Sequence, residues 1–278
     1  MYLIVEKREL ASSIKSVKIL APEIAEKAQA GQFVIVRVDD KGERIPLTLV
    51  DWNRSEGTVT LIFLEVGVST RKLGKLEKGN AIMDVAGPLG CPSEIKNYGT
   101  VCVVGGGVGI AAAYPIARAL KEAGNKVLSI IGARTAGLLI LEDEMRKVSD
   151  ELYISTDDGT KGHKGFVSDV LKTLIQKGYN FNLVYAIGPA VMMRAVAETT
   201  RPYKIRTIAS LNSIMVDGMG MCGACRVTVG GKTKFACVEG PEFDAHQVDF
   251  GELIKRQMFF LSEEKLALEK WEHRGCCK

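Results

Sequence analysis

The sequence predicts an antiparallel β-barrel over residues 1–96, a parallel α/β domain over 97–209, a small cysteine-containing module over 210–250, and a C-terminal helix and tail over 251–278. Three observations predict this order. Short alternating apolar runs fill the first third of the chain, apolar runs alternate with amphipathic stretches in the middle, and a segment rich in Gly, Met and Cys follows. A chain of 278 residues is long enough for two domains and an appended module.

The first 96 residues are expected to form strands. Apolar runs at 32–38 and 57–64 are separated by Gly, Asp and Asn, which favour turns. This spacing is typical of an antiparallel barrel or sandwich. From residue 98 the pattern changes, and the expected strands and helices cover 100–104, 109–123, 126–131, 152–156, 166–177 and 183–187. Strands that alternate with helices in this way predict a parallel sheet.

The last quarter of the chain is expected to contain a hairpin and a helix. The hairpin runs from 226–229 through Gly230-Gly231 into 233–236. Residues 250–274 have apolar side chains at helical spacing with charges between them. We expect this helix to pack on the chain's own body rather than on a partner.

Composition excludes several classes of protein. The chain has 46% hydrophobic and 25% charged residues, which is typical of a soluble globular protein. A net charge of +4, without a dense basic run, argues against nucleic acid as the main partner. No apolar stretch is long enough to span a membrane and the N-terminus lacks the layout of a signal peptide, so we expect a cytoplasmic protein.

The cysteines indicate a metal site. Three of the seven lie close together, as Cys222, Cys225 and Cys237, and Asp217 stands where plant-type [2Fe–2S] loops of the form C-x4-C-x2-C have their first cysteine. Asp217, Cys222, Cys225 and Cys237 are therefore the expected cluster ligands. A zinc site formed by the three cysteines and His246 is the alternative.

The other four cysteines are less favoured as ligands, and a ligand role stays open for Cys276 and Cys277. Cys91 and Cys102 lie in or beside strand-like segments and are expected to be core thiols. Cys276 and Cys277 stand on a short tail.

A nucleotide site is expected at the ends of the α/β strands. An apolar strand runs into a glycine turn at Gly105, Gly106, Gly107 and Gly109, where phosphate can approach the backbone and the start of a helix. Further candidates follow the other strands of the sheet, namely Arg134, Asp157, Asp158, Gly188 and Pro189. The second strand lacks the acidic residue that usually contacts the ribose of NAD, so NAD and NADP stay open. Asp157 and Asp158 have an equal alternative as turn formers.

Two motifs in the barrel carry a family resemblance. Arg44, Pro46, Leu47 and Thr48 have the form R-x-P-L-T, and Val66, Gly67, Ser69 and Thr70 belong to the form V-G-x-[GS]-T-x-x-L. Together with the glycine turn and the cysteine loop, they make nearly the whole chain resemble the ferredoxin-NADP reductase superfamily, in the branch of dihydroorotate dehydrogenase electron-transfer subunits. With Asp217 in the loop, the chain is most similar to the small subunits of NADH-dependent reduced ferredoxin:NADP oxidoreductases, also called sulfide dehydrogenase beta subunits.

The resemblance implies an oxidoreductase subunit with FAD on the barrel, held by the residues of both motifs. It implies hydride exchange between NAD(H) and FAD, with NADP(H) left open, and passage of single electrons through a [2Fe–2S] cluster. It also implies a larger partner subunit with another FAD and [4Fe–4S] clusters, ferredoxin reached through that complex, and flavin-based electron bifurcation. No catalytic acid, base or nucleophile is expected. The electron-transfer subunit of an NAD-dependent dihydroorotate dehydrogenase is the near alternative, and a zinc-containing nucleotide-binding regulatory module is the remote one.

Overall fold

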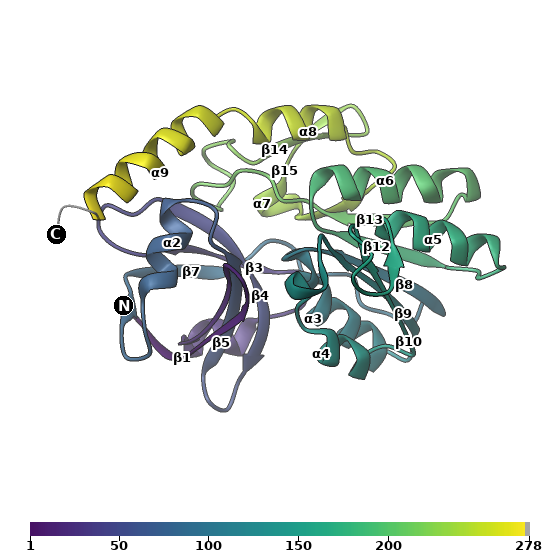
Figure 1. Ribbon diagram of the computed structural model, residues 1–278, viewed down its shortest axis with the longest axis horizontal. Coiled ribbons are helices and arrows are strands. Elements are labelled where there is room, and N and C mark those ends of the chain that lie inside the picture. The colour runs from purple at the N-terminus through teal and green to yellow at the C-terminus, as the bar shows by residue number, and fades with distance from the viewer. Residues whose placement is uncertain (276–278) are drawn as a thin grey trace.

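The computed structural model describes residues 1–275, so Cys276 and Cys277 lie outside the described residues. The chain forms a curled antiparallel sheet, a parallel sheet with helices on both faces, and a small module above the junction between them (Figure 1). This architecture confirms the predicted fold class. None of the described helices is both long and apolar enough to cross a membrane.

The barrel sheet has the strand order β6-β1-β2-β5-β4-β3-β7. Its strands are β1 (Tyr2–Ala11), β2 (Ile14–Leu20), β3 (Phe33–Arg37), β4 (Arg44–Asn53), β5 (Thr58–Leu64), β6 (Ala81–Ile82) and β7 (Asp84–Leu89). Alternating apolar side chains fill its interior, among them Val17, Val36 and Leu61. Two short helices, α1 (Pro22–Lys27) and α2 (Val68–Lys75), which the sequence pattern does not reveal, flank the strands.

The parallel sheet has the order β11-β10-β9-β8-β12-β13-β16, with only β16 antiparallel to its neighbour. Its first six strands along the chain are β8 (Thr100–Gly106), β9 (Lys126–Ala133), β10 (Glu151–Thr156), β11 (His163–Lys164), β12 (Leu183–Ile187) and β13 (Thr207–Ser210). Its α-helices are α3 (Gly109–Glu122), α4 (Glu142–Lys147), α5 (Val167–Gln176) and α6 (Ala190–Thr200), with 3-10 turns at Ala136–Leu138 and Arg201–Tyr203. Helices α3 and α4 cover one face and α5 and α6 the other, so both faces are buried (Figure 1).

The module contains the predicted hairpin, β14 (Arg226–Val229) with β15 (Lys232–Phe235), followed by α7 (Ala236–Glu239). Strand β16 (Glu242–Asp244) then joins the parallel sheet beside β13. Where one helix was expected over 250–274 there are two, α8 (Phe250–Gln257) and α9 (Leu261–Gly275). As expected, α9 packs on the chain's own body, against α2 (Figure 1).

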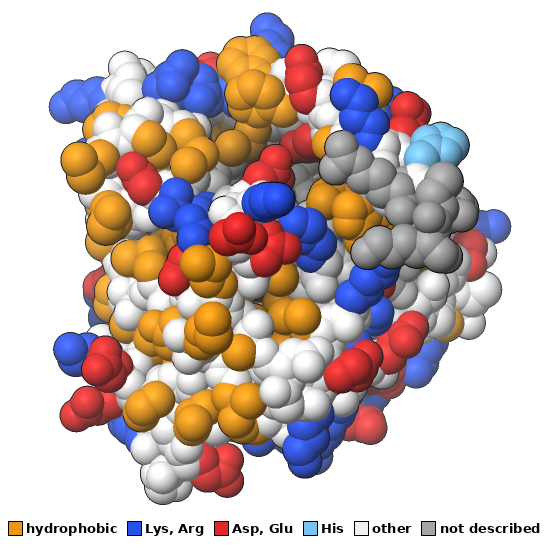
Figure 2. Space-filling view, turned by 90° about the vertical axis from the view of Figure 1, so that its left-hand side faces the viewer, with side chains coloured by type: hydrophobic (Ala, Val, Ile, Leu, Met, Phe, Trp, Pro, Cys, Tyr) orange, Lys and Arg blue, Asp and Glu red, His pale blue; other side chains and the backbone are white. Residues whose placement is uncertain are grey.

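The surface is mixed in charge where the barrel and α9 face outward. Figure 2 shows blue and red side chains interspersed among apolar ones on that face. Such a distribution is that of an ordinary solvated surface.

Candidate functional site

The glycine turn lies at the point where the strand order of the parallel sheet reverses. Strand β9 lies on one side of β8 and β12 on the other, so the chain leaves the carboxyl ends of β8 and β12 in opposite directions. In open α/β sheets such a point forms the crevice that binds nucleotides. Gly105 and Gly106 end β8, Gly107 to Gly109 lead into α3, and Gly188-Pro189 follow β12, so the structure brings the two predicted segments together.

Two of these glycines are required, Gly109 by close packing and Gly107 by its backbone conformation. A Cβ atom at Gly109 would lie 2.6 Å from the backbone oxygen of Ile187 and 2.7 Å from Cα of Gly188. Gly107 has a φ of 56°, which side chains other than glycine adopt only with strain. The backbone is therefore bare where α3 begins, as phosphate binding requires.

The other predicted nucleotide contacts follow β9 and β10. Arg134 and Asp157 are exposed there, and the N–H of Asp158 donates to the backbone oxygen of Arg134 at 3.2 Å. The Asp158 carboxylate accepts from the N–H of Thr160 at 3.0 Å and from its hydroxyl at 2.7 Å. The backbone hydrogen bond from Thr160 lowers the pKa of the Asp158 carboxyl. Asp158 thus forms a turn, while its part in nucleotide binding stays a prediction.

The R-x-P-L-T motif occupies the start of β4. Pro46 pairs with Ile35 of β3, and Thr48 pairs with Phe33, so the motif lies in the strand next to β3. Arg44 is exposed, while Pro46, Leu47 and Thr48 are half-buried. An exposed guanidinium beside half-buried side chains suits a bound group with an apolar ring system and an anionic tail.

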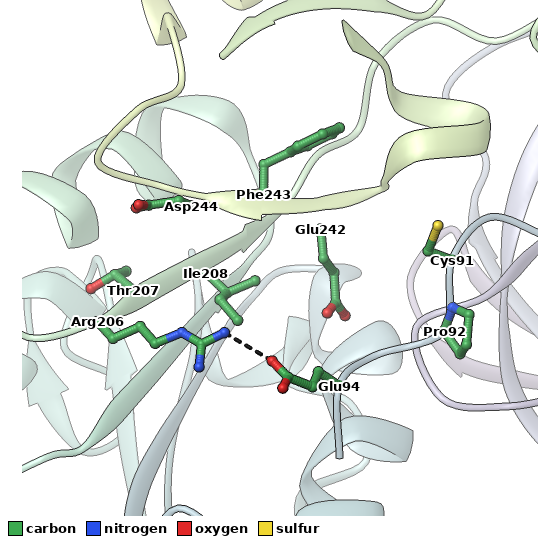
Figure 3. Close-up of a pocket in the computed structure, with 9 residues that line it drawn as sticks. All are labelled: Cys91, Pro92, Glu94, Arg206, Thr207, Ile208, Glu242, Phe243 and Asp244. Carbon is green, nitrogen blue, oxygen red and sulfur yellow. Dashed lines mark hydrogen bonds and ion pairs between the residues drawn. The ribbon is translucent and has the colours of Figure 1, made fainter. Parts of the chain in front are cut away.

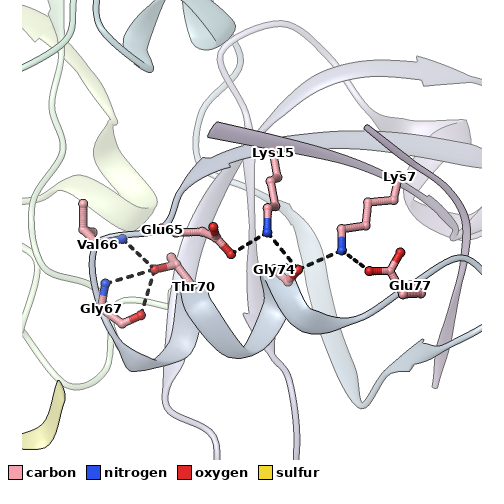
Figure 4. Close-up of polar contacts among 8 residues, drawn as sticks. All are labelled: Lys7, Lys15, Glu65, Val66, Gly67, Thr70, Gly74 and Glu77. Atoms are coloured by element: carbon pink, nitrogen blue, oxygen red, sulfur yellow. Dashed lines mark hydrogen bonds and ion pairs between the residues drawn. The ribbon is translucent and has the colours of Figure 1, made fainter. Parts of the chain in front are cut away.

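The V-G-x-[GS]-T motif forms the turn into α2 (Figure 4). The Thr70 hydroxyl accepts from the N–H groups of Val66 and Gly67, each at 3.1 Å, and donates to the Gly67 oxygen at 3.1 Å. Ser69 donates to the Glu43 carboxylate at 3.2 Å. Thr70 therefore fixes the loop, and the first turn of α2 has N–H groups available to an anion.

The other end of α2 is anchored to the barrel by two lysines (Figure 4). Lys7 and Lys15 donate to the Gly74 backbone oxygen at 2.8 and 3.1 Å, and Lys15 also pairs with Glu65 at 3.0 Å. A Cβ at Gly74 would lie 1.6 Å from Glu65 Oε1, so a larger residue there would displace the Glu65 side chain from its pair with Lys15. Cations at a helix C-terminus are favourable, and these two set the direction in which α2 points.

The proposed cluster ligands lie on two segments of the module. Asp217 accepts from the N–H groups of Met219 and Cys222 at 3.2 and 3.1 Å, and the first of these bonds lowers the pKa of its carboxyl. Cys225 and Cys237 are buried with their sulfur atoms 3.2 Å apart, whereas Cys222 is exposed. The structure therefore brings Asp217 to the backbone of Cys222 and Cys225 to Cys237.

The donor set fits an iron–sulfur cluster better than zinc. Thiolates are the usual ligands of such clusters, and glycines with positive φ at 218, 220 and 223 let the loop curl. Among residues 1–275, no three His, Cys, Asp or Glu side chains gather around a single metal position, and this holds for the proposed cluster ligands as well as for the zinc set. His246 is 2.9 Å from the Thr200 hydroxyl, so the alternative Cys3His zinc site is not assembled in the described chain.

A half-buried carboxyl that the sequence does not reveal lies where barrel, sheet and module meet. Ser93 donates to Glu242 Oε1 at 2.5 Å, and a Cβ at Gly31 would lie 2.9 Å from the same oxygen. Desolvation raises the pKa of the Glu242 carboxyl to about 7, against the opposing effect of the Ser93 and Tyr185 hydroxyls. The Tyr185 hydroxyl is buried and makes no hydrogen bond of normal geometry with the described residues. No local sequence signal marks Glu242, because its neighbours come from distant segments.

Glu242 lines a hollow of about 350 Å³ (Figure 3). Its lining includes Arg206 and Glu94, which form an ion pair with a nitrogen–oxygen distance of 3.0 Å. Cys91 also lines this hollow and is exposed, so the expectation that it is a core thiol is wrong, because its loop runs over the surface. Cys102 is buried in β8 as expected, and burial raises the pKa of its thiol.

Comparisons with known proteins show which families this chain resembles. Two family models match, the iron-sulfur cluster binding domain of dihydroorotate dehydrogenase B over residues 212–249 and the oxidoreductase NAD-binding domain over residues 103–198. A dihydroorotate dehydrogenase B (NAD(+)) electron transfer subunit homolog of Thermotoga maritima is 47% identical over 268 residues, which cover 96% of this chain and 94% of that protein.

Two further relatives cover almost the whole chain. An uncharacterized protein from the adh 3' region of Clostridium beijerinckii is 45% identical, over 99% of this chain and 98% of its own length. A solved structure of NADH-dependent reduced ferredoxin-NADP oxidoreductase, described in a study of flavin-based electron bifurcation, superposes with a TM-score of 0.93. It is 46% identical and covers 98% of both chains.

Gly109→Ala tests the nucleotide crevice. The added Cβ meets two backbone atoms that cannot rotate away, so we expect a loss of about 1–3 kcal/mol in the free energy of unfolding and weaker NADH binding. Denaturant unfolding and NADH titration measure both effects. Gly137→Ala is the matched control, because its Cβ would meet no atom closer than 3.9 Å. Equal behaviour of the two variants would contradict the close packing.

Glu242→Gln tests the half-buried carboxyl. The pKa of the Glu242 carboxyl is raised from its ordinary value of 4.5 to about 7 in the folded protein. Between pH 4.5 and pH 7 the wild-type protein therefore releases a proton when it unfolds, and its free energy of unfolding falls as the pH rises through this window. The fall is about 3 kcal/mol at most. The variant keeps an acceptor for Ser93, so it should match wild type near pH 4 and be more stable at pH 8. Parallel pH profiles, measured beside the exposed control Glu122→Gln, would refute this.

Proposed function

The chain belongs to the family of dihydroorotate dehydrogenase B electron transfer subunits and their homologues, and from this premise we propose how its residues serve that role. It is an oxidoreductase subunit of the ferredoxin reductase type, which uses NAD(H), FAD and a [2Fe–2S] cluster for electron transfer. Hydride transfer and one-electron transfer are the chemistry that these groups supply when bound.

One contact carries the proposal. Gly218, next to Asp217 in the cluster loop, packs so closely on β3 that a Cβ there would lie 2.8 Å from Ile35 Cγ1. Ile35 in turn pairs with Pro46 of the R-x-P-L-T motif. The segment proposed to hold the cluster and the strand proposed to hold the flavin are therefore separated by a single strand.

We assign the residues as follows. Flavin contacts come from both barrel motifs, at Arg44, Pro46, Leu47, Thr48, Val66, Gly67, Ser69 and Thr70. Nicotinamide nucleotide contacts come from the crevice, at Gly105, Gly106, Gly107, Gly109, Arg134, Asp157, Asp158, Gly188 and Pro189. Asp217, Cys222, Cys225 and Cys237 hold the cluster.

In this proposal the role of the protein is to hold the cofactors in position. The bare glycine backbone at the start of α3 admits a pyrophosphate, and the first turn of α2 offers N–H groups to a second one. The half-buried β4 side chains present an apolar surface to a ring system, and burial of Cys225 and Cys237 keeps water from two of the sulfur ligands. We assign no residue to acid–base or nucleophilic catalysis.

The family relationship implies a larger partner subunit. We propose that this partner carries another FAD and [4Fe–4S] clusters, reaches ferredoxin, and takes part in electron bifurcation, as the 46% identical oxidoreductase suggests. Exposed apolar side chains support a partner surface, Met219 and Met221 in the module and Phe259 and Phe260 in the turn between α8 and α9. We also propose a cytoplasmic location, since reduced thiols are needed for the cluster.

A dihydroorotate dehydrogenase assembly is the second candidate. The matching cluster-domain model and the Thermotoga maritima relative both bear that enzyme's name. Asp217 favours the first candidate, an electron-bifurcating NADH-dependent reduced ferredoxin:NADP oxidoreductase, because the dihydroorotate dehydrogenase pattern has cysteine at that position.

Cys222→Ser, with cofactor analysis, tests the cluster assignment. We expect wild type purified without oxygen to contain FAD, iron and acid-labile sulfide, and the variant to lose most iron and its reduced electron paramagnetic resonance signal while keeping FAD. The exposed Cys91→Ser is the matched control. An unchanged signal in Cys222→Ser would remove Cys222 from the ligand set, and zinc without sulfide in wild type would defeat the cluster itself.

Purification with the natural partner separates the two candidates. We expect a larger subunit with flavin and iron–sulfur clusters, and NADH-dependent reduction of NADP in the presence of reduced ferredoxin. A partner that oxidises dihydroorotate would instead establish the second candidate.

A further inference from the structure

The C-terminal arm, defined as α8, residues 258–260 and α9, touches the cluster loop at one end. The Arg256 guanidinium donates to the backbone oxygen of Ala224 at 3.1 Å, and Ala224 lies between Cys222 and Cys225. Gln257 donates to the backbone and side-chain oxygens of Asn212 at 2.9 and 2.8 Å. The end of α8 is thereby fixed to both sides of the loop.

The other end of the arm rests on α2. The Lys75 ammonium lies 4.1 Å from the centre of the Trp271 ring, and Arg71 forms an ion pair with Glu272. Both basic residues belong to the helix whose first turn is assigned to the flavin phosphates. In Figure 1 the yellow helix α9 runs from the module to a position over α2.

Helix α8 packs on α6 and β14, but between Gln257 and Leu268 the arm packs on little else. Residues 261–267 are exposed, and the first half-buried side chains of α9 are Leu268 and Trp271. Its 15 residues span about 22 Å as a helix. The contacts with the cluster loop and with α2 lie at opposite ends of the arm, so the arm links these two segments through the turn at residues 258–260 and through α9.

We propose that the C-terminal arm couples the flavin helix α2 to the cluster loop, with Trp271 and Arg256 as positioning residues. The inference rests on the proposed function, since it takes FAD at α2 and the cluster at residues 217–237. Helix α2 has only eight residues, so its order depends on tertiary contacts. Lys7 and Lys15 hold it from the barrel side and the arm holds it from outside, which reduces the ordering cost that FAD binding must meet.

Trp271→Ala in the full chain tests this coupling, with Trp271→Phe as the conservative variant and the exposed Leu266→Ala as the control in the same helix. Each cluster-loaded protein is titrated with FAD by flavin fluorescence, and hydrogen exchange of residues 217–225 is followed by mass spectrometry. We expect Trp271→Ala to weaken FAD binding about three- to tenfold, from the loss of the cation–π contact. It should also speed exchange in the cluster loop, while the other two variants stay near wild type.

Coupling is reciprocal, so Arg256→Ala must weaken FAD binding although Arg256 touches only the module end. Unchanged FAD affinity in Arg256→Ala, or wild-type exchange of residues 217–225 in Trp271→Ala, would overturn the inference. Thermal unfolding identifies a variant that fails to fold. If Trp271→Ala does not fold, the FAD affinity of Arg256→Ala decides whether the coupling exists. If the wild-type protein binds no FAD, the proposed function is overturned rather than the coupling. The wild-type titration shows this before any variant is compared.

Discussion

The seating of the cluster loop on strand β3 is the constraint on which the rest of the structure depends. Gly218 adopts a φ of 75° and has no room for a Cβ against Ile35 and Leu89, so backbone conformation and packing require the same residue. Cys225 and Cys237 belong to the same apolar core as Ile35. Packing thus determines how far the proposed cluster stands from the barrel, and electron transfer needs that distance to be short.

Strand β4 links this contact to the nucleotide domain. Its beginning pairs with β3, and farther along the strand Asp51 forms an ion pair of 2.7 Å with Arg118 of α3. Arg118 also lies over the Trp52 ring, 5.3 Å from its centre. Since α3 begins at the glycine turn, the paired strands β4 and β3 align the nucleotide crevice on one side and the cluster loop on the other.

The parts predictable from sequence are those whose physical cause is local. The glycine turn, the R-x-P-L-T strand and the hairpin at 226–235 each follow from neighbouring residues, and the structure contains all three. Glu242 could not be found this way, because its burial depends on Ser93, 149 residues away. The contact of Arg71 with Glu272 spans 201 residues. The strand-like sequence around Cys91 predicts a core thiol, but it does not reveal that this loop lies on the surface.

The arrangement of the module also gives the proposed electron path a direction. Cys225 and Cys237 face the core shared with β3, whereas Cys222 and Met221 are exposed. A cluster held by this ligand set therefore has one side toward the barrel and one toward solvent, where a partner can approach. Ligand binding by buried thiols is linked to folding, so loading the cluster and closing the core of the module stabilise each other. Loss of the cluster would therefore destabilise the module whose residues hold it.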